Sequence, residues 1–500
     1  MNKAPQITRA YSSYALGILT LINVVNYMER NVIFALFEPI KRDLHLTDAH
    51  LGWLGAAYVL VFSIAALPVG VFSDLRSRTG MTAFGVALWS AFTSLGGLVR
   101  SFAQLIVCRA AVGLGGAAAN AAGTALVADF FTGSARALAM SIFTAGLALG
   151  GVLGILVAGQ LEAAYGWRVA FLALGLPGFG LALLASRLRD PLHWGALLPI
   201  VDELRSLGLG ARAMIMRGLP LLGGLALGTL GAWIANNRYG AGSAVDAAVF
   251  AVFTALGLAW NIVLWVRRAR RTSQHPSSQL SLGMESALQD LIRAFNTVFG
   301  TPTLLWVFVG GALISFGMNG IIGWAPAFMT RELGLTVARA SILLGKWGLV
   351  FGIAGTLCGG FLADYLQKRR PWARVVVSSI GFLLGGPLAI WLLTIRDLNL
   401  FIPVFCAAFF FLTWYNGPLT SVIFDVTPQR ISTTVAGAYL LFIHLAGDAV
   451  ALPLVGILSD RFGIAKAVII LPIMAIIGGV VVLGGVRTVG RDMSRVSSGA

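Results

Sequence analysis

Two charged residues stand side by side inside the first long apolar segment of the chain, residues 14–37. On a helix, Asn26 and Arg30 would fall on one face, and Glu29 would border that face. An ionisable group in hydrocarbon is costly unless it is paired or faces water. Burial favours the neutral form of a carboxylate, whereas a nearby guanidinium favours the ionised form. Glu29, with Arg30 beside it, is therefore a candidate proton carrier, and Asn26 is a candidate substrate ligand; a structural ion pair near the membrane edge is the alternative.

A second cation in an apolar segment, Arg109, heads a stripe that continues through Gly113, Gly116 and Asn120 at helical spacing. The glycines leave this face without bulk, so it can border a cavity or another helix. We expect Arg109 to pair with Glu29 across a central cavity and to share in proton coupling. Because arginine binds phosphate and carboxylate groups well, Arg109 and Asn120 are also candidate substrate ligands.

Further polar side chains lie at predicted mid-membrane depth in the second part of the chain. They are Asn319, Tyr415, Asn416, His444 and Asp448. Asn319 follows Glu29 by 290 residues, and Asn416 precedes a helix-breaking Gly-Pro pair. His444 and Asp448 are four residues apart, on one face of a helix. We expect all five to line a substrate site, although the His–Asp pair could equally be a structural hydrogen bond.

The composition excludes a soluble protein. Hydrophobic residues make up 58% of the 500 residues and charged residues only 11%, whereas soluble domains carry about 25% charged residues. So few charges cannot cover a surface that faces water, and lipid is therefore the predicted solvent. The formal net charge of +16 is then attributed to basic cytoplasmic loops, and no nucleic-acid partner is expected.

The elements that position these residues are membrane-spanning helices of roughly 20 residues each. The predicted spans lie near 14–37, 50–73, 81–99, 103–128, 137–160 and 168–187, then near 303–328, 341–363, 375–394, 399–424, 432–458 and 465–486, with two more near 217–235 and 245–266. We therefore predict an all-α membrane protein with 14 spans. It would comprise a six-helix bundle in residues 1–191, a linker with two extra spans in residues 192–300, and a second six-helix bundle in residues 301–500.

The two predicted bundles repeat each other. Residues 70–78 and 360–368 share a glycine, an aspartate and a final cation at a constant offset of 290 residues. Asp129, after the fourth span, is likewise echoed by Asp425. With both termini in the cytoplasm, most of the 36 lysines and arginines lie in cytoplasmic segments, as the positive-inside rule requires.

Catalytic and cofactor motifs are not found in the sequence. It holds no HExxH, GxSxG, P-loop or strand-linked GxGxxG pattern. The three cysteines lie in apolar runs without the spacing of a disulfide framework or a zinc site. We therefore predict a protein that is not an enzyme, with no cofactor and no metal. Without a nucleotide site, energy would come from an ion gradient or from the gradient of the substrate.

The loop at residues 70–78 and its repeat resemble the signature of the major facilitator superfamily. The resemblance implies that the aspartate and arginine of this loop form a charge network at the cytoplasmic ends of neighbouring helices, which holds one access state. Leu75 stands where an arginine is usual. The candidate gating residues are Gly70, Asp74, Arg78, Asp129, Asp364 and Lys368.

Several short segments are similar to the Spinster-like branch of this superfamily, including residues 26–30, 109–115, 166–171, 324–328 and 447–448. The resemblance implies a secondary active transporter that works by alternating access and is coupled to protons. Its implied substrate is an amphipathic anionic lipid, such as a lysophospholipid or a sphingoid phosphate. In this branch a second carboxylate is usual seven residues after the arginine, where this chain has Gly116.

Two other functions remain open from the sequence. One is a proton-coupled symporter of a small organic anion, and the other is a membrane scaffold or sensor that transports nothing. In each case we expect a monomer, surrounded by membrane lipids, in a bacterial inner membrane.

Overall fold

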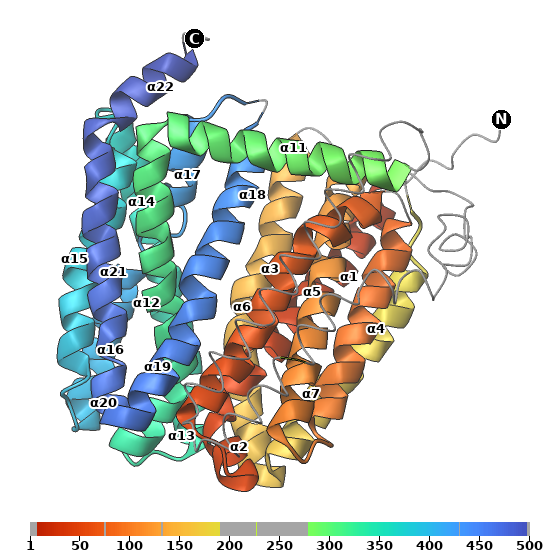
Figure 1. Ribbon diagram of the computed structural model, residues 1–500, viewed down its shortest axis with the longest axis vertical. Helices are drawn as coiled ribbons and strands as arrows, with labels where there is room; N and C mark the ends of the chain where they lie inside the picture. The colour runs from red at the N-terminus through yellow and green to blue at the C-terminus, as the bar shows by residue number, and fades with distance from the viewer. Residues whose placement is uncertain are drawn as a thin grey trace. The chain divides into compact units, whose positions relative to one another are not determined.

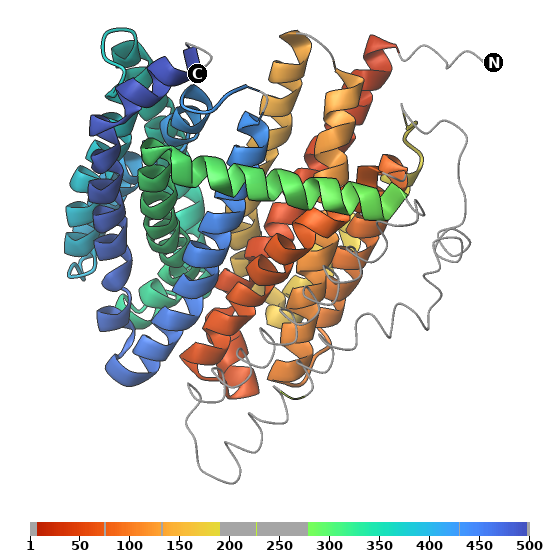
Figure 2. The ribbon, with the colours of Figure 1, turned by 45° about the horizontal axis from the view of Figure 1, so that its top comes forward.

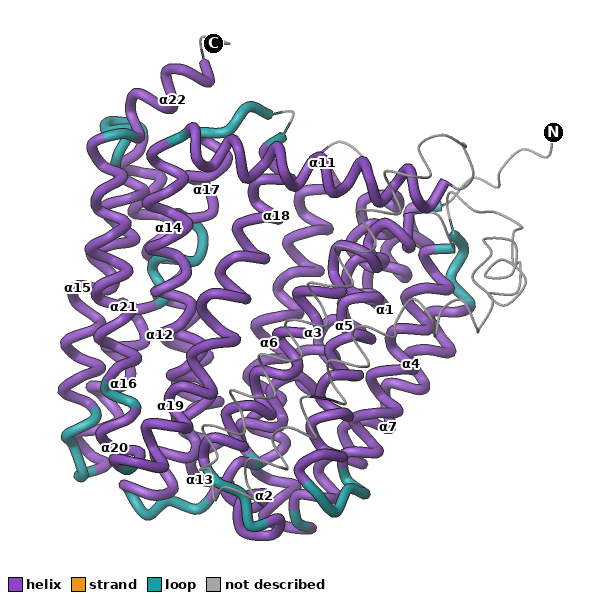
Figure 3. The backbone as a smooth tube through the Cα atoms, in the orientation of Figure 1, coloured by secondary structure: helices purple, strands orange, loops and turns teal. Residues whose placement is uncertain are grey.

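The computed structural model describes residues 8–74, 77–131, 134–190, 227, 279–429 and 431–497. These residues form helices joined by short loops, and they include no strand (Figure 3). The chain divides into two compact units, one of residues 1–192 and 289–500 and one of residues 193–288. The two inserted spans that the sequence predicts, near 217–235 and 245–266, lie outside the described residues apart from residue 227. The predicted total of 14 spans therefore stays a prediction.

The larger unit begins with helices that we call the first half. They are α1 (Arg9–Ala35), α2 (Phe37–Leu44), α3 (Asp48–Asp74), α4 (Arg78–Gly96), α5 (Phe102–Phe130), α6 (Ser134–Tyr165) and α7 (Trp167–Ser186). These helices form where the sequence predicts the first six spans, with α2 as a short addition after α1. Helix α1 contains no proline and has a long apolar face, and it packs along α6. Helices α3 and α4 pack on α5.

The helices after the gap form the second half. They are α11 (Gln279–Gly300), α12 (Pro302–Glu332), α13 (Val337–Leu343), η1 (Leu344–Gly348), α14 (Leu349–Gln367), α15 (Ala373–Leu392), α16 (Leu398–Leu412), α17 (Pro418–Asp425), α18 (Ser432–Ile443), η2 (His444–Asp448), α19 (Ala449–Phe462), α20 (Ile464–Ala467), α21 (Ile470–Leu483), η3 (Gly484–Arg487) and α22 (Val489–Ser497). The predicted span near 399–424 is broken into α16 and α17, because Pro418 cannot continue the ladder of the preceding helix.

Among the described residues, nine helical segments are long and apolar enough to cross a membrane. Two of them contain a turn of π-helix, η1 between α13 and α14 and η2 between α18 and α19. Such turns are frequent at functional sites. The second of these, η2, carries two residues that the sequence predicts to line a substrate site.

The two halves meet most closely where α3 lies beside α19 (Figures 1 and 2). Gly52 of α3 approaches the backbone of Leu452 so closely that a Cβ would collide with it, and Gly456 of α19 approaches the backbone of Asp48 in the same way. Reciprocal glycines of this kind let two helix backbones touch. We call the end of the larger unit where α1 and α12 begin the terminal end, and the end where α3 begins the distal end.

Candidate functional site

Glu29 is fully buried within the first half. Its side chain points from α1 toward α4 and α7, where Thr93, Trp89 and Ser90 are the nearest polar groups and Gly178 lies against one carboxylate oxygen. Neither oxygen makes a hydrogen bond of normal geometry to any of them. Glu29 is thus an acid in a dry pocket of neutral groups, where an ionised carboxylate would be costly.

Arg109 is also buried, with a side chain that is 1% exposed, but it does not pair with the carboxylate of Glu29. Its guanidinium donates to two main-chain carbonyl oxygens of α1, that of Glu29 at 3.0 Å and that of Arg30 at 2.7 Å, and lies 5.6 Å from the Tyr58 ring centroid. The expected Glu29–Arg109 pair across a central cavity is therefore wrong. The physical reason is that α1 turns its backbone, not the Glu29 side chain, toward α5.

Arg30 is the cation that reaches from the first half to the second. Its Nη2 lies 3.9 Å from Oδ2 of Asp448, and its guanidinium lies 5.2 Å from the ring centroid of Tyr27 and 5.3 Å from that of Tyr58. The Arg30 side chain is 12% exposed and that of Asp448 is 1% exposed. A planar guanidinium suits both an ion pair and stacking on aromatic rings, so Arg30 is fixed between the halves.

Asp448 gathers polar side chains around it at the turn η2. Its Oδ2 lies 2.7 Å from Nδ1 of His444, and its Oδ1 accepts hydrogen bonds from Nδ2 of Asn319, at 2.8 Å, and from the hydroxyl of Ser315. We call Arg30, Ser315, Asn319, His444 and Asp448 the Asp448 cluster. The sequence predicts four of these residues as site residues, and Ser315 escaped notice because serine is common in membrane helices.

Asn26 and Asn120 lie together in the first half, at a small cavity that we call the Asn cavity. The cavity has room for about one water molecule and is lined by Leu19, Ile22, Asn23, Asn26, Trp89, Ala119, Asn120, Gly123 and Phe143. Tyr58 donates a hydrogen bond to Oδ1 of Asn26 at 3.3 Å. Thr124 donates to Oδ1 of Asn120 at 3.3 Å. The two asparagines therefore share one space, on α1 and α5.

Tyr415 and Asn416 are not hydrogen-bonded to the Asp448 cluster within the described residues. The ring of Tyr415 packs against Phe382 with centroids 5.1 Å apart. Asn416 donates to the hydroxyl of Thr356 on α14 at 3.1 Å, in the break between α16 and α17. Their predicted role in the substrate site stays a prediction.

Charged residues at the terminal end form a similar network in each half. Arg78 at the start of α4 pairs with Asp129 at the end of α5. Arg374 at the start of α15 pairs with Asp425 at the end of α17 and with Asp364 at 2.8 Å. In both halves the arginine and the later aspartate are 51 residues apart.

This pairing corrects one predicted gating residue. Lys368, expected as the counterpart of Arg78, makes no ion pair among the described residues, and Arg374 holds that place instead. The reason is a longer loop, because Arg374 follows Asp364 by 10 residues. The side chain of Asp74 lies outside the described residues, and Gly70 has open space around it.

A network that the sequence analysis missed joins the halves at the distal end. Arg331 donates to both carboxylate oxygens of Asp48, at 2.6 and 2.7 Å, and to Oε1 of Glu38 at 2.6 Å. Lys41 donates to Oδ1 of Asp48 at 2.6 Å. The hydroxyl of Ser459 donates to Oδ2 of Asp48. These contacts link α12 and α19 of the second half to α2 and α3 of the first.

Asp460 completes this distal network from α19. Its two carboxylate oxygens accept the backbone N–H groups of Asp48 at 2.8 Å and of Ala49 at 2.9 Å. A carboxylate at a helix N-terminus satisfies free amides and complements the helix dipole. Asp460 thus caps α3 across the boundary between the halves. The sequence does hold a signal for this network, because Ser459, Asp460 and Arg331 lie at the ends of two predicted spans. Charged residues are common at the ends of membrane helices, however, so this signal is weak.

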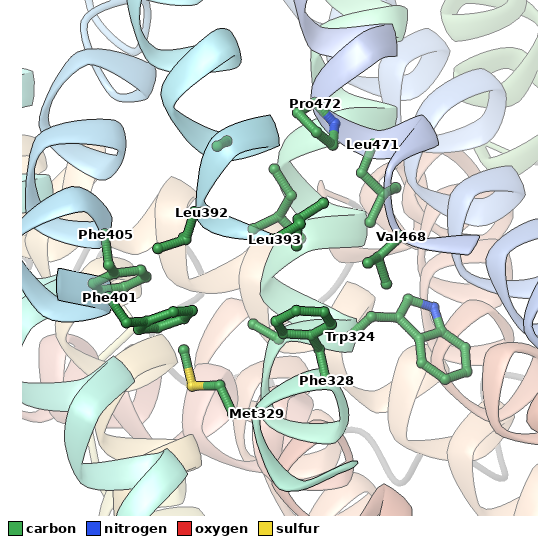
Figure 4. A pocket seen from close by; sticks show the side chains of 13 residues that line it. Trp324, Phe328, Met329, Leu392, Leu393, Phe401, Phe405, Val468, Leu471 and Pro472 are labelled. Carbon is green, nitrogen blue, oxygen red and sulfur yellow. The ribbon is translucent and has the colours of Figure 1, made fainter. Parts of the chain in front are cut away.

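An apolar cavity lies inside the second half, among α12, α15, α16 and the α20–α21 segment (Figure 4). Its lining is built from aromatic and aliphatic side chains, among them Trp324, Phe328, Leu392, Phe401 and Phe405. On α12 these residues lie on the face turned away from Asn319. The apolar cavity is therefore separate from the Asp448 cluster.

Comparison with known proteins identifies the class of this fold. The profile of the family described as Major Facilitator Superfamily matches residues 19–197 and 200–447. The chain belongs to the major facilitator superfamily and is a membrane transporter, not an enzyme.

Individual relatives narrow the similarity within this class. An MFS-type efflux pump of Mycolicibacterium smegmatis is 25% identical over 89% of this chain and 84% of that protein. Protein spinster of Drosophila melanogaster is 23% identical over 89% of this chain and 62% of that protein. A crystal structure of a bacterial homolog to the human lysosomal transporter Spinster, inward-facing and unoccupied, superposes with a TM-score of 0.72 at 19% identity, over 97% of this chain and 99% of that one. The predicted similarity to Spinster proteins is thereby confirmed.

Proposed function

We propose that this transporter moves an amphipathic anionic lipid, such as a lysophospholipid or a sphingoid phosphate, by proton-coupled alternating access. The observation that carries the proposal is the contact between Arg30 of the first half and Asp448 of the second. This ion pair joins the two moving halves at membrane depth. Binding of substrate or a proton at the pair therefore changes the interaction between the halves.

The Asp448 cluster supports an anionic head group. Asp448 neutralises Arg30 while it is ionised, and a proton on the His444–Asp448 pair leaves Arg30 with excess positive charge. Arginine then offers a planar fork of donors to a phosphate or carboxylate. The helices around the cluster are largely apolar, which suits a hydrocarbon tail. We assign this binding to Arg30 and not to Arg109, because two nitrogens of Arg109 already donate to the backbone of α1.

Glu29 supplies the second proton-carrying group of the proposal. It is adjacent to Arg30 on α1, so a proton gained or lost at Glu29 changes the field in which Arg30 contacts Asp448. A change in the protonation of Glu29 is also coupled to conformation. Because the pocket is buried, ionising Glu29 requires either water or a movement of α1 against α4 and α7.

The conformation supports access from the terminal end. The distal network ties the halves together, whereas at the terminal end the ion pairs of Arg78 with Asp129 and of Arg374 with Asp425 each stay within one half. We place the terminal end in the cytoplasm of a bacterial cell, with the chain as a monomer in the inner membrane. The unit of residues 193–288 would be the inserted pair of spans.

The experiment is transport by purified protein in liposomes. We expect uptake of a fluorescent lysophospholipid driven by a pH gradient, and no uptake of small carboxylates such as galacturonate. Arg30→Gln should reduce lysolipid transport at least tenfold, and Lys466→Gln, at an exposed distal position, should leave it unchanged. Transport of the small acid alone would establish a small-anion symporter, and transport of neither, with Arg30→Gln silent, would indicate a scaffold or sensor.

Proton coupling has its own variant. Glu29→Gln mimics the neutral acid and should abolish transport driven by a pH gradient, while exchange of labelled for unlabelled substrate continues. Unchanged driven transport in Glu29→Gln would remove Glu29 from the mechanism.

A further inference from the structure

We propose that the Asn cavity, which has room for about one water molecule, is the hydrated step of a passage through which protons reach Glu29 from the terminal end. The proposal rests on the role of Glu29 as proton carrier, and it adds the route, its residues and its direction. The route runs inside the first half and is separate from the contact between Arg30 and Asp448.

The position of the Asn cavity gives the direction. On α1 its lining residues run from Leu19 to Asn26, all of which precede Glu29 and therefore lie toward the terminal end. On α5 they run from Ala119 to Gly123, past Arg109, which contacts α1 at the level of Glu29. Because α5 runs opposite to α1, both helices place the cavity on the same side. At about 1.5 Å per residue, Leu19 lies roughly 15 Å from Glu29 along α1.

Trp89 connects the Asn cavity to Glu29. Its side chain lines the cavity and is also one of the polar groups next to the carboxyl of Glu29. The indole is 1% exposed, and its Nε1–H has no hydrogen-bond partner. A buried indole N–H is normally satisfied, and the acceptor nearest to this one is the Glu29 carboxyl, so Trp89 directs its donor from the cavity lining toward Glu29.

Unpartnered polar atoms are concentrated around Glu29. Besides Trp89 Nε1, they include both carboxylate oxygens of Glu29 and the hydroxyls of Ser90 and Thr93, which are all buried. Buried polar groups without partners are costly, and internal water is the usual remedy, with about three hydrogen bonds to each molecule. The Asn cavity adds the amides of Asn26 and Asn120 and has room for a water molecule. Donors and acceptors suited to a short proton relay are thus present at the Asn cavity and around Glu29.

The charged and titratable groups near Glu29 leave no other partner for its proton. Arg109 of α5 donates to backbone carbonyls and, as a guanidinium, does not release a proton. Tyr58 of α3 donates its hydroxyl to Asn26, at the cavity. The groups that α4 and α7 turn to Glu29 are the indole, two hydroxyls and Gly178, which are neutral. Proton exchange at Glu29 therefore needs water, and the Asn cavity is where water fits.

Infrared spectroscopy of the purified full-length transporter tests this passage. The carbonyl stretch of a neutral Glu29 is assigned as the band that Glu29→Gln removes, and its exchange is timed after transfer to D₂O. Asn120→Leu removes the polar group at nearly constant volume, and Gly123→Val fills the cavity, where a Cβ would meet Phe143 only at van der Waals distance. We expect each to slow deuteration of the Glu29 band at least tenfold, while Asn399→Leu, the same change at an exposed position in the second half, has no effect.

The outcomes separate this proposal from the transport mechanism. Wild-type exchange rates in folded Asn120→Leu and Gly123→Val protein would overturn the passage, as would the lack of any carbonyl band that Glu29→Gln removes. Slowed exchange would support the passage even where Glu29→Gln leaves driven transport intact, a result that refutes only the coupling role of Glu29.

Discussion

At the scale of single residues, the three charges at membrane depth in the first half have three different solutions. Two nitrogens of Arg109 donate to the backbone of α1, Arg30 contacts Asp448 and two aromatic rings, and Glu29 makes no hydrogen bond of normal geometry. The first is structural, because a buried guanidinium with fixed carbonyl partners has no reason to change them. The other two can change partner or charge, and the proposed mechanism uses both.

Arg109 should therefore matter for stability more than for substrate selection. Arg109→Ala removes two charge-assisted hydrogen bonds, each worth about 1.5–3 kcal/mol, and leaves two carbonyl oxygens in an apolar setting. We expect a clear fall in melting temperature in detergent, and only partial recovery in Arg109→Lys, since a lysine cannot span both carbonyls in the same way. A variant with unchanged melting temperature and altered substrate preference would contradict this view.

Gly178 should be a sensitive position beside Glu29. A Cβ at this residue would collide with the hydroxyl of Ser90 and would touch Oε1 of Glu29 at 3.4 Å. We expect Gly178→Ala to reduce pH-gradient-driven transport severalfold, and Ser90→Ala in the same chain to restore part of it. Gly180→Ala on the same helix, where the space is open, is the control. Equal activity of the two alanine variants would show that the pocket is not tightly packed.

At the scale of helices, the terminal-end networks show what a repeat preserves. The preserved feature is a pairing between the start of one helix and the end of another, 51 residues later, in both halves. The loop before the arginine differs in length between the halves, so alignment at a fixed offset selects Lys368 and misses Arg374.

Two parallel substitutions distinguish these cations. Arg374→Ala breaks contacts to Asp364 and Asp425 and should lower transport severalfold with a small loss of stability, of about 1 kcal/mol, because the arginine is partly exposed. Lys368→Ala should be silent in both measurements. A loss of transport in Lys368→Ala with none in Arg374→Ala would reverse the assignment.

At the scale of the whole molecule, the distal network holds one arrangement of the two halves. Arg331 and Asp460 of the second half both bind Asp48 of the first half, one at its side chain and the other at its backbone. Separation of the halves at this end therefore breaks all of these bonds together. Such a set of contacts biases an equilibrium between two conformations without contacting substrate.

Loss of Arg331 should open the distal end. With spin labels at Arg42 and Phe462, both exposed at this end, Arg331→Gln should increase the population with long label separations about tenfold. This corresponds to about 1.4 kcal/mol, a modest share of what a fully buried ion pair contributes. Arg396→Gln, which breaks a pair with Glu332 inside the second half, should not change the distances. Identical distance distributions for Arg331→Gln and the unsubstituted protein would refute a gating role.

The sequence predicted the transporter class, the helical spans of both halves and most residues of the Asp448 cluster. These features follow from the length of apolar segments and from single charges within them, which can be recognised without a structure. It did not predict the partner of Arg109, since helical spacing gives a face of α1 but not the rotation of that face against α5. The distal network was also missed. Its residues lie at helix ends, where charges normally face water and carry little information.

The cap that Asp460 places on α3 has one more consequence. The first two amides of helix α3 donate to a carboxylate from a different part of the chain, so the amide hydrogens of residues 48 and 49 are shielded only while the two halves stay in contact at the distal end. The rate of deuterium uptake at these two amides therefore measures how often the distal end opens. Mass spectrometry can follow it in the unlabelled protein and in a cell's own lipids.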